Sequence, residues 1–145
     1  IVYLLGWYSR MISVSFAKIY QIGWKGSGMT NEQKTPTTLI AALNNGPVDF
    51  AEVMKVIDEN YNFTPVAFRN GNTHNAENTN NGSCKVFSFA KRHNLTVQAT
   101  LNAFGNYYIV DVLQHPENDD HQNIRNFMEF GWDGIEFTGE ALTER

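Results

Sequence analysis

From residue 35 onward, the chain is divided into short helical segments by residues that begin and end helices. The pair Thr35-Pro36 is typical of a helix start, and Gly46-Pro47 marks where that helix stops. Asp49 and Glu52 then have the spacing of a capping box, and apolar residues recur after them at helical intervals as far as Asn60. No internal repeat is present and no linker separates two cores, so the pattern predicts one compact domain.

The remaining segments predict further short helices and two strands. The expected helices cover residues 84–93, 97–104, 107–114 and 120–130, and their caps or stops are Ser83, Thr96, Pro116, Asp119 with Gln122, and Gly131. Residues 63–69 are expected to form a strand that pairs with residues 134–139, and residues 72–82 a polar loop without regular structure. The prediction is therefore an α+β fold: a mostly helical single domain with a small antiparallel β element.

The distribution of charge restricts the class of partner. The chain has 11 basic and 15 acidic residues, and residues 1–28 contain three of the bases (Arg10, Lys18 and Lys25) and no acid. The remainder therefore has 11 − 3 = 8 bases against 15 acids, a balance of −7. An acidic body lacks the positive surface that phosphate backbones require, so we expect no nucleic-acid partner.

Residues 1–28 differ from the rest of the chain and are expected to lie outside the core. Arg10 and Lys18 break their apolar run into pieces too short for a transmembrane segment, and the basic start of a secretory signal is missing. One interpretation is an amphipathic helix that lies on a surface. The other is that Met29 is the true start and residues 1–28 are translated upstream sequence. Either way, residues 29–145 are the expected domain.

Cys84 is the strongest candidate for a catalytic residue. It is the only cysteine, so no internal disulfide can form, which fits a reducing cytoplasm or a chain that leaves the cell without an oxidative folding step. If solvent can reach Cys84, its expected place just after the capping Ser83 would favour the thiolate and lower the thiol pKa. A cysteine nucleophile needs a base, and His115 and His121 are the candidates on later elements. The alternative is that Cys84 is a small buried apolar residue.

A second group of candidates surrounds these two histidines. It consists of Asp111, His115, Asp119, Asp120, His121 and Arg125. Two imidazoles with carboxylates can bind Zn²⁺ or a related metal, but the His-x₅-His spacing is no established ligand motif, so no metal site is assigned. The structural alternative is that His121 is partly buried between the last two helices, with Asp111 or Asp120 as its hydrogen-bond acceptor.

Two arginines are candidates for binding anions. Arg69 precedes the turn pair Asn70-Gly71, and Arg125 follows His121 by one helical turn. The sequence contains no Gly-rich phosphate loop and no serine nucleophile elbow, so no cofactor is expected.

Several longer blocks of sequence resemble the HopJ family of type III effector-like proteins. The blocks are AEVM (51–54), IDENY (57–61), FTP (63–65), FRNG (68–71), GSCK (82–85), FSFA (87–90), FG (104–105), YY (107–108), DVLQHP (111–116), DHQNIRNFM (120–128) and GW (131–132). The resemblance implies a virulence-associated bacterial protein that a type III apparatus can secrete. It implies no settled reaction.

Three functions therefore stay open. The first is an effector or interaction protein with a protein partner and no catalysis, which predicts an exposed apolar patch and no organised pocket. The second is a small hydrolase that uses Cys84 with His115 or His121, which predicts that these side chains converge in a cleft. The third is a metal-binding protein that uses the His115 and His121 cluster. Whether the chain is an enzyme, and its oligomeric state, are not predicted.

Overall fold

The computed structural model describes residues 34–145, which form one compact unit. The helices are α2 (Pro36–Asn45), α3 (Phe50–Asn60), α4 (Asn81–Arg92), α5 (Val97–Asn102) and α6 (Gln122–Phe130), with a π-type helix η2 (Tyr107–Val112) and a short 3₁₀ turn η3 (Gly131–Gly134). The strands are β1 (Tyr61–Phe63), β2 (Phe68–Asn70), β3 (Thr73–Asn75), β4 (Ile135–Phe137) and β5 (Leu142–Glu144). The predicted α+β fold is confirmed, whereas the predicted boundary at residues 28 and 29 lies outside the described residues.

The helix starts show which local signals decide a boundary. Thr35 caps α2 through a reciprocal pair of hydrogen bonds with Thr38, as Thr35-Pro36 predicts. The capping box predicted for α3 is wrong, because Asp49 makes no side-chain cap and the Glu52 carboxylate instead pairs with Lys34 Nζ at 3.0 Å. The start predicted for α4 is also wrong. That helix begins at Asn81, so Ser83 lies inside the first turn and does not cap it.

The strands form one interrupted antiparallel ribbon. β1 pairs with β5, where Phe63 faces Leu142, and β2 pairs with β4, where Phe68 faces Phe137. The register of the second pair continues that of the first along the same two stretches of chain. Between these pairs, Thr64 N–H donates to the Ala141 carbonyl and Thr138 N–H to the Ala67 carbonyl. Hydrogen-bonding positions recur every second residue in such a ladder, so positions 64 and 67 are out of phase and the ribbon is broken between them.

The ribbon partly confirms the strand predictions. The pairing expected between residues 63–69 and 134–139 is confirmed at β2 and β4. The loop expected at residues 72–82 is wrong at its start, because Thr73–Asn75 form β3 and complete a hairpin with β2. Gly71 makes that turn with a φ of +58°, the conformation that glycine adopts most readily. The sequence prediction missed β5.

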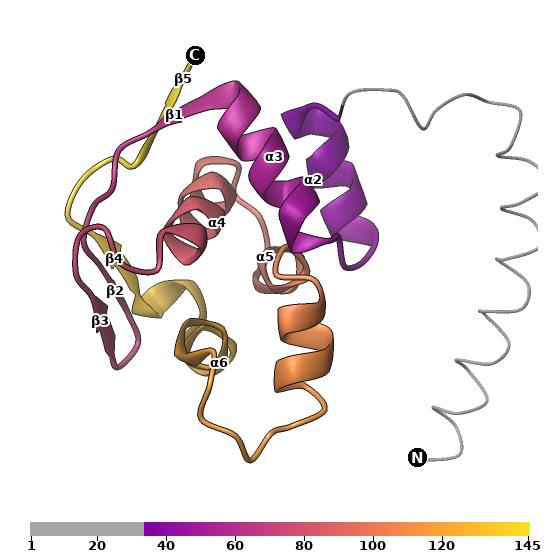
Figure 1. Cartoon of the computed structure of the whole chain (residues 1–145), viewed down its shortest axis with the longest axis vertical. Coiled ribbons are helices and arrows are strands. Elements are labelled where there is room, and N and C mark those ends of the chain that lie inside the picture. The colour runs from indigo at the N-terminus through magenta and orange to yellow at the C-terminus, as the bar shows by residue number, and fades with distance from the viewer. Residues whose placement is uncertain (1–33) are drawn as a thin grey trace, which may run out of the picture. The chain divides into compact units, whose positions relative to one another are not determined.

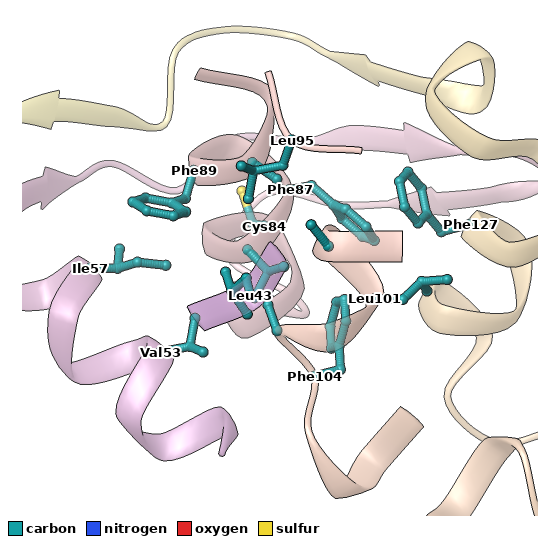
Figure 2. Close-up of a cluster of buried hydrophobic side chains, with 14 of the residues drawn as sticks. Leu43, Val53, Ile57, Cys84, Phe87, Phe89, Leu95, Leu101, Phe104 and Phe127 are labelled. Atoms are coloured by element: carbon teal, nitrogen blue, oxygen red, sulfur yellow. The ribbon is translucent and has the colours of Figure 1, made fainter. Parts of the chain in front are cut away.

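Helix α4 is the centre of the core, between the α2–α3 pair and the strands (Figure 1). Its Phe87 is fully buried and its ring packs against the rings of Phe68, Phe104 and Phe127 (Figure 2). Burying a large apolar side chain of this kind contributes about 2–3 kcal/mol, so this cluster holds helices and ribbon together. Within residues 34–145, no helix is long and apolar enough to cross a membrane.

Candidate functional site: a polar hollow at the start of α4

A hollow of about 220 Å³ lies where the first turn of α4 meets η2 and the start of α6. Its walls are Phe50, Asn80, Gly82, Ser83, Phe104, Tyr107, His121, Asn123 and Ile124. Gly82 is needed here, because a Cβ atom at that position would lie 2.8 Å from the Phe50 ring. The backbone N–H groups of the first turn of α4 have no helical partner, so this helix end offers hydrogen-bond donors beside the hollow.

His121 lines one wall of the hollow and is hydrogen-bonded to Asp111 of η2. The imidazole Nε2 lies 2.9 Å from Asp111 Oδ2, and the imidazole ring is 5.3 Å from the ring of Tyr107. The His121 side chain is 29% exposed. The prediction of a partly buried His121, held between η2 and α6 by Asp111, is confirmed. The expected capping box of Asp119 and Gln122 is wrong, because His121 directly precedes α6 and Gln122 Nε2 donates to the Asp119 backbone carbonyl.

The backbone around the hollow is in uncommon conformations. Asn80 and His121 have φ angles of +50° and +51°, in the left-handed region that non-glycine residues rarely adopt. Tyr107 and Asp111 belong to η2, and π-type turns occur often at functional sites. Strained backbone of this kind costs about 1–3 kcal/mol per residue and persists where the surrounding structure requires it. Their presence on the same hollow marks it as a functional candidate.

A buried network of asparagines supports the floor of the hollow. Asn123 Oδ1 accepts hydrogen bonds from the side-chain amides of Asn70 and Asn75 at 3.0 and 3.1 Å, and Asn123 Nδ2 donates to Asn75 Oδ1. Asn80 Nδ2 also donates to Asn75 Oδ1, at 2.7 Å. A buried amide network fixes the positions of its members because each lost bond is costly. It therefore positions Asn80 and Asn123 on the wall of the hollow.

The sequence reasoning missed this network. It interpreted Asn70 as a turn residue and Asn75 as part of a polar loop. A usable signal was present on α6, where Asn123 and Asn126 alternate with the apolar Ile124 and Phe127 on the buried side. Two amides on a core-facing side require polar partners, and those partners lie on the β2–β3 hairpin.

Cys84 lies away from the hollow and inside the core. It is 1% exposed, and its Sγ atom lies 3.9 Å from the Val66 carbonyl oxygen. Cys84 is the fourth residue of α4, and burial raises the pKa of its thiol. The lowered pKa is predicted for a thiol that solvent reaches, and that condition is not met. Of the chain's four histidines, none makes a hydrogen bond to Cys84. The structure does not bring the predicted thiol and imidazoles together.

His115 is not part of the hollow either. Its side chain is half exposed, and Nδ1 lies 3.8 Å from the Glu117 carboxylate. Within residues 34–145, no three histidine, cysteine or acidic side chains gather closely enough to hold a metal ion. His115 and His121 therefore do not form the cluster on which the metal-binding alternative depends.

The two arginines predicted to bind anions are held by protein groups. The Arg125 guanidinium donates to the Asp120 side chain at 2.7 Å and to the backbone carbonyls of His115, Pro116 and Asp120. It thereby fastens the loop between η2 and α6, and its hydrogen bond lowers the pKa of the Asp120 carboxyl. Arg69 lies on β2, 3.8 Å from the Glu136 carboxylate. Anion binding by either arginine stays a prediction.

Comparisons with known proteins agree with the resemblance seen in the sequence. Residues 36–142 match the model of the HopJ type III effector protein family. A crystal structure of a protein of unknown function is 51% identical to the chain, with a TM-score of 0.75, and the match covers 83% of this chain and 99% of that one. A search of the curated proteins found no match.

Proposed function

Because the chain belongs to the HopJ type III effector family, we propose that it is an effector or interaction protein that acts by binding a partner and not through a catalytic thiol. The hollow at the start of α4 is the proposed binding site. Delivery from the bacterial cytoplasm by a type III apparatus is part of the same proposal. It would be supported if a tagged full-length chain were exported by a wild-type strain and retained by a strain without the apparatus.

The single observation that carries the proposal is the convergence at the hollow. The imidazole of His121, which Asp111 holds, the partly exposed ring of Tyr107 and the first turn of α4 lie around one opening. These are groups that recognise a partner through hydrogen bonds and ring stacking. This opening is an organised polar hollow and not the exposed apolar patch predicted from the sequence for an interaction protein. Gly82, Ser83, Tyr107 and His121 also fall within the sequence blocks that resemble the family.

The hydrolase alternative has less support. It requires Cys84 as a thiolate beside an imidazole, whereas the sulfur is buried and its pKa is raised. An ester such as p-nitrophenyl acetate tests it directly. We expect the full chain and the Cys84→Ala variant to hydrolyse the ester at the same slow, non-saturable rate. Saturable turnover that Cys84→Ala abolishes would contradict the proposal.

Photo-crosslinking tests the binding site itself. A photoreactive amino acid is placed at Tyr107, 46% exposed at the hollow, and in a second protein at Leu113, which is 43% exposed and lies outside it. In a host-cell extract, we expect a discrete adduct from position 107 and none of the same size from position 113. The substitution Ser83→Phe, which fills the hollow, should remove the adduct. Equal adducts from both positions would refute the hollow as the binding site.

A further inference from the structure

We propose that a second hollow, between α4 and residues 137–142, binds a small monocarboxylate with an apolar body. This inference is independent of the function proposed for the hollow at the start of α4, because the two hollows share no residue.

The second hollow exists because the β ribbon is broken. Between β4 and β5, residues 139 and 140 make no backbone hydrogen bond across the ribbon, and they lie opposite Pro65, which has no N–H to donate to a ladder. There the ribbon separates from the outer face of α4 and leaves a space of about 370 Å³. This is within the range of small-molecule sites in proteins. The space suits a ligand that is the size of one aromatic ring with a short side chain.

One wall of this hollow is apolar. The apolar side chain exposed on this wall is the partly buried Phe137. Ala141 and Leu142, which are 3% and 2% exposed, form a fixed base beside it and add little accessible area. An apolar ligand body that covers this wall removes apolar area from water on both sides. The wall therefore selects a ligand with an aromatic or aliphatic part.

The opposite wall carries a cation that has no carboxylate partner. Lys91 and Arg92 both line the hollow from α4. Arg92 is paired with Glu140 and Glu144, at 3.5 and 3.2 Å, whereas no acidic side chain of residues 34–145 lies within ion-pair distance of Lys91. The Lys91 ammonium instead lies over the Phe137 ring, 5.6 Å from its centre. A ligand carboxylate beside Phe137 would supply the missing counter-charge.

Further hydrogen-bonding capacity lies along the same walls. Ser88 lies one turn before Lys91 and Arg92 on the same face. Its Oγ atom is buried and has no hydrogen-bond partner apart from the neighbouring Cys84 thiol, so it becomes available to a ligand only when the Ser88 side chain rotates toward the hollow. On the facing segment, the backbone N–H groups of Gly139 and Glu140 donate no hydrogen bond to residues 34–145. Gly139 and Glu140 are exposed, so these N–H groups are open to solvent and can donate to a ligand carboxylate, which accepts several hydrogen bonds at once.

The charges around the hollow favour a single negative charge on the ligand. Glu140 lies on the wall, and it shares the Arg92 guanidinium with Glu144, so the two acids are only partly neutralised. A phosphate or a dicarboxylate would meet this negative charge with only Lys91 left to balance it. A monocarboxylate needs only the one ammonium group.

The test is an NMR titration of the ¹⁵N-labelled full chain with phenylacetate. We expect saturable shifts of the backbone amides of Ser88, Gly139 and Ala141, with a Kd on the order of 1 mM for so small a probe. Two analogues serve as controls: 2-phenylethanol, which lacks the charge, and 2-phenylethylamine, which reverses it. Both should bind about tenfold more weakly or worse. Equal binding of the alcohol, or no saturable shift with phenylacetate, would overturn the proposal.

Two substitutions give opposite expected results. Lys91→Gln removes the counter-charge and should weaken phenylacetate binding about tenfold, the effect of one charge-assisted hydrogen bond. Glu140→Gln removes a repelling charge and should tighten it. Lys55→Gln, an exposed lysine on α3 far along the chain from the hollow, is the control and should bind as the wild type does. If Lys91→Gln bound phenylacetate as tightly as Lys55→Gln, the assigned site would be wrong.

Discussion

The substitution Asn123→Ala tests whether the asparagine network holds the hollow at the start of α4 in place. The change removes three side-chain hydrogen bonds: two that Oδ1 accepts from Asn70 and Asn75, and one that Nδ2 donates to Asn75. Each is worth about 1 kcal/mol net, which gives about 3 kcal/mol. Asn70 keeps its bond to the Asn123 backbone carbonyl and Asn75 keeps its bond to Phe68, so a loss of about 2–3 kcal/mol is expected.

Urea denaturation followed by circular dichroism measures this loss directly. In a thermal melt, a domain of this size loses roughly 4 °C in Tm for each kcal/mol of stability lost, so the Tm should fall by about 8–12 °C. Asn45→Ala is the matched control, because Asn45 is exposed and its amide bonds only the Ala41 carbonyl of its own helix. That variant should stay within about 0.5 kcal/mol of the wild type.

A double-mutant cycle with Asn75→Ala separates the network from a simple loss of volume. If the amides of Asn75 and Asn123 stabilise each other, the double variant should lose clearly less than the sum of the single losses. Additive losses, or an Asn123→Ala variant as stable as Asn45→Ala, would refute the argument that the network positions the wall of the hollow.

Four further predictions follow from single contacts. The His93 imidazole is hydrogen-bonded to the Tyr61 hydroxyl, and burial lowers its pKa in the folded protein. As the pH falls below about 6.5, the unfolded chain therefore takes up the proton before the folded one does, and the free energy of unfolding should decrease. His93→Gln should reduce this dependence on pH in urea denaturation at several pH values. Iodoacetamide should label Cys84 far more slowly in the native protein than in urea, and rapid native labelling would contradict its burial. His121→Ala, which breaks the bond to Asp111, should lower the free energy of unfolding by about 1–3 kcal/mol. Gly105→Ala places a Cβ atom 2.8 Å from the Val48 carbonyl oxygen at a φ of +56°, and it should lower the free energy of unfolding by more than about 1–2 kcal/mol. In the control Gly46→Ala the added Cβ atom meets nothing within 4 Å, so that variant should melt almost as the wild type does.

Local signals predicted the elements that depend on neighbours in the sequence. The Thr35 cap of α2 and the Thr96 cap of α5 were readable because each involves a hydroxyl and an N–H group three residues away. The predicted capping box at Asp49 is absent: the Asp49 side chain makes no cap, and Glu52 pairs with Lys34, on the preceding part of the chain. The predicted cap at Ser83 failed because the helix starts earlier, after Asn80, whose side chain is bonded to Asn75.

The candidate site was only partly readable from the sequence. A carboxylate acceptor for His121, from Asp111 or Asp120, was expected because a buried imidazole needs one, and the structure selects Asp111. The helical periodicity used in that prediction does not apply, because His121 precedes α6 in a left-handed conformation. The burial of Cys84 was one of two alternatives, and the sequence could not choose between them. A cysteine near a helix start is reactive or inert according to what covers it, and the cover here is the Val66 segment of the ribbon.

The sequence by itself determined the mostly helical character of the chain, the pairing of residues 63–69 with residues 134–139, and the family. These follow from periodicity, turn residues and motif blocks, which are local properties. The tertiary structure decided which polar groups meet. Asn70 and Asn123 are 53 residues apart, and Cys84 is 18 residues from the Val66 carbonyl. No local pattern encodes such contacts, since they form only when the apolar faces of α4, α6 and the ribbon pack together and bring buried amides and carbonyls within hydrogen-bonding distance.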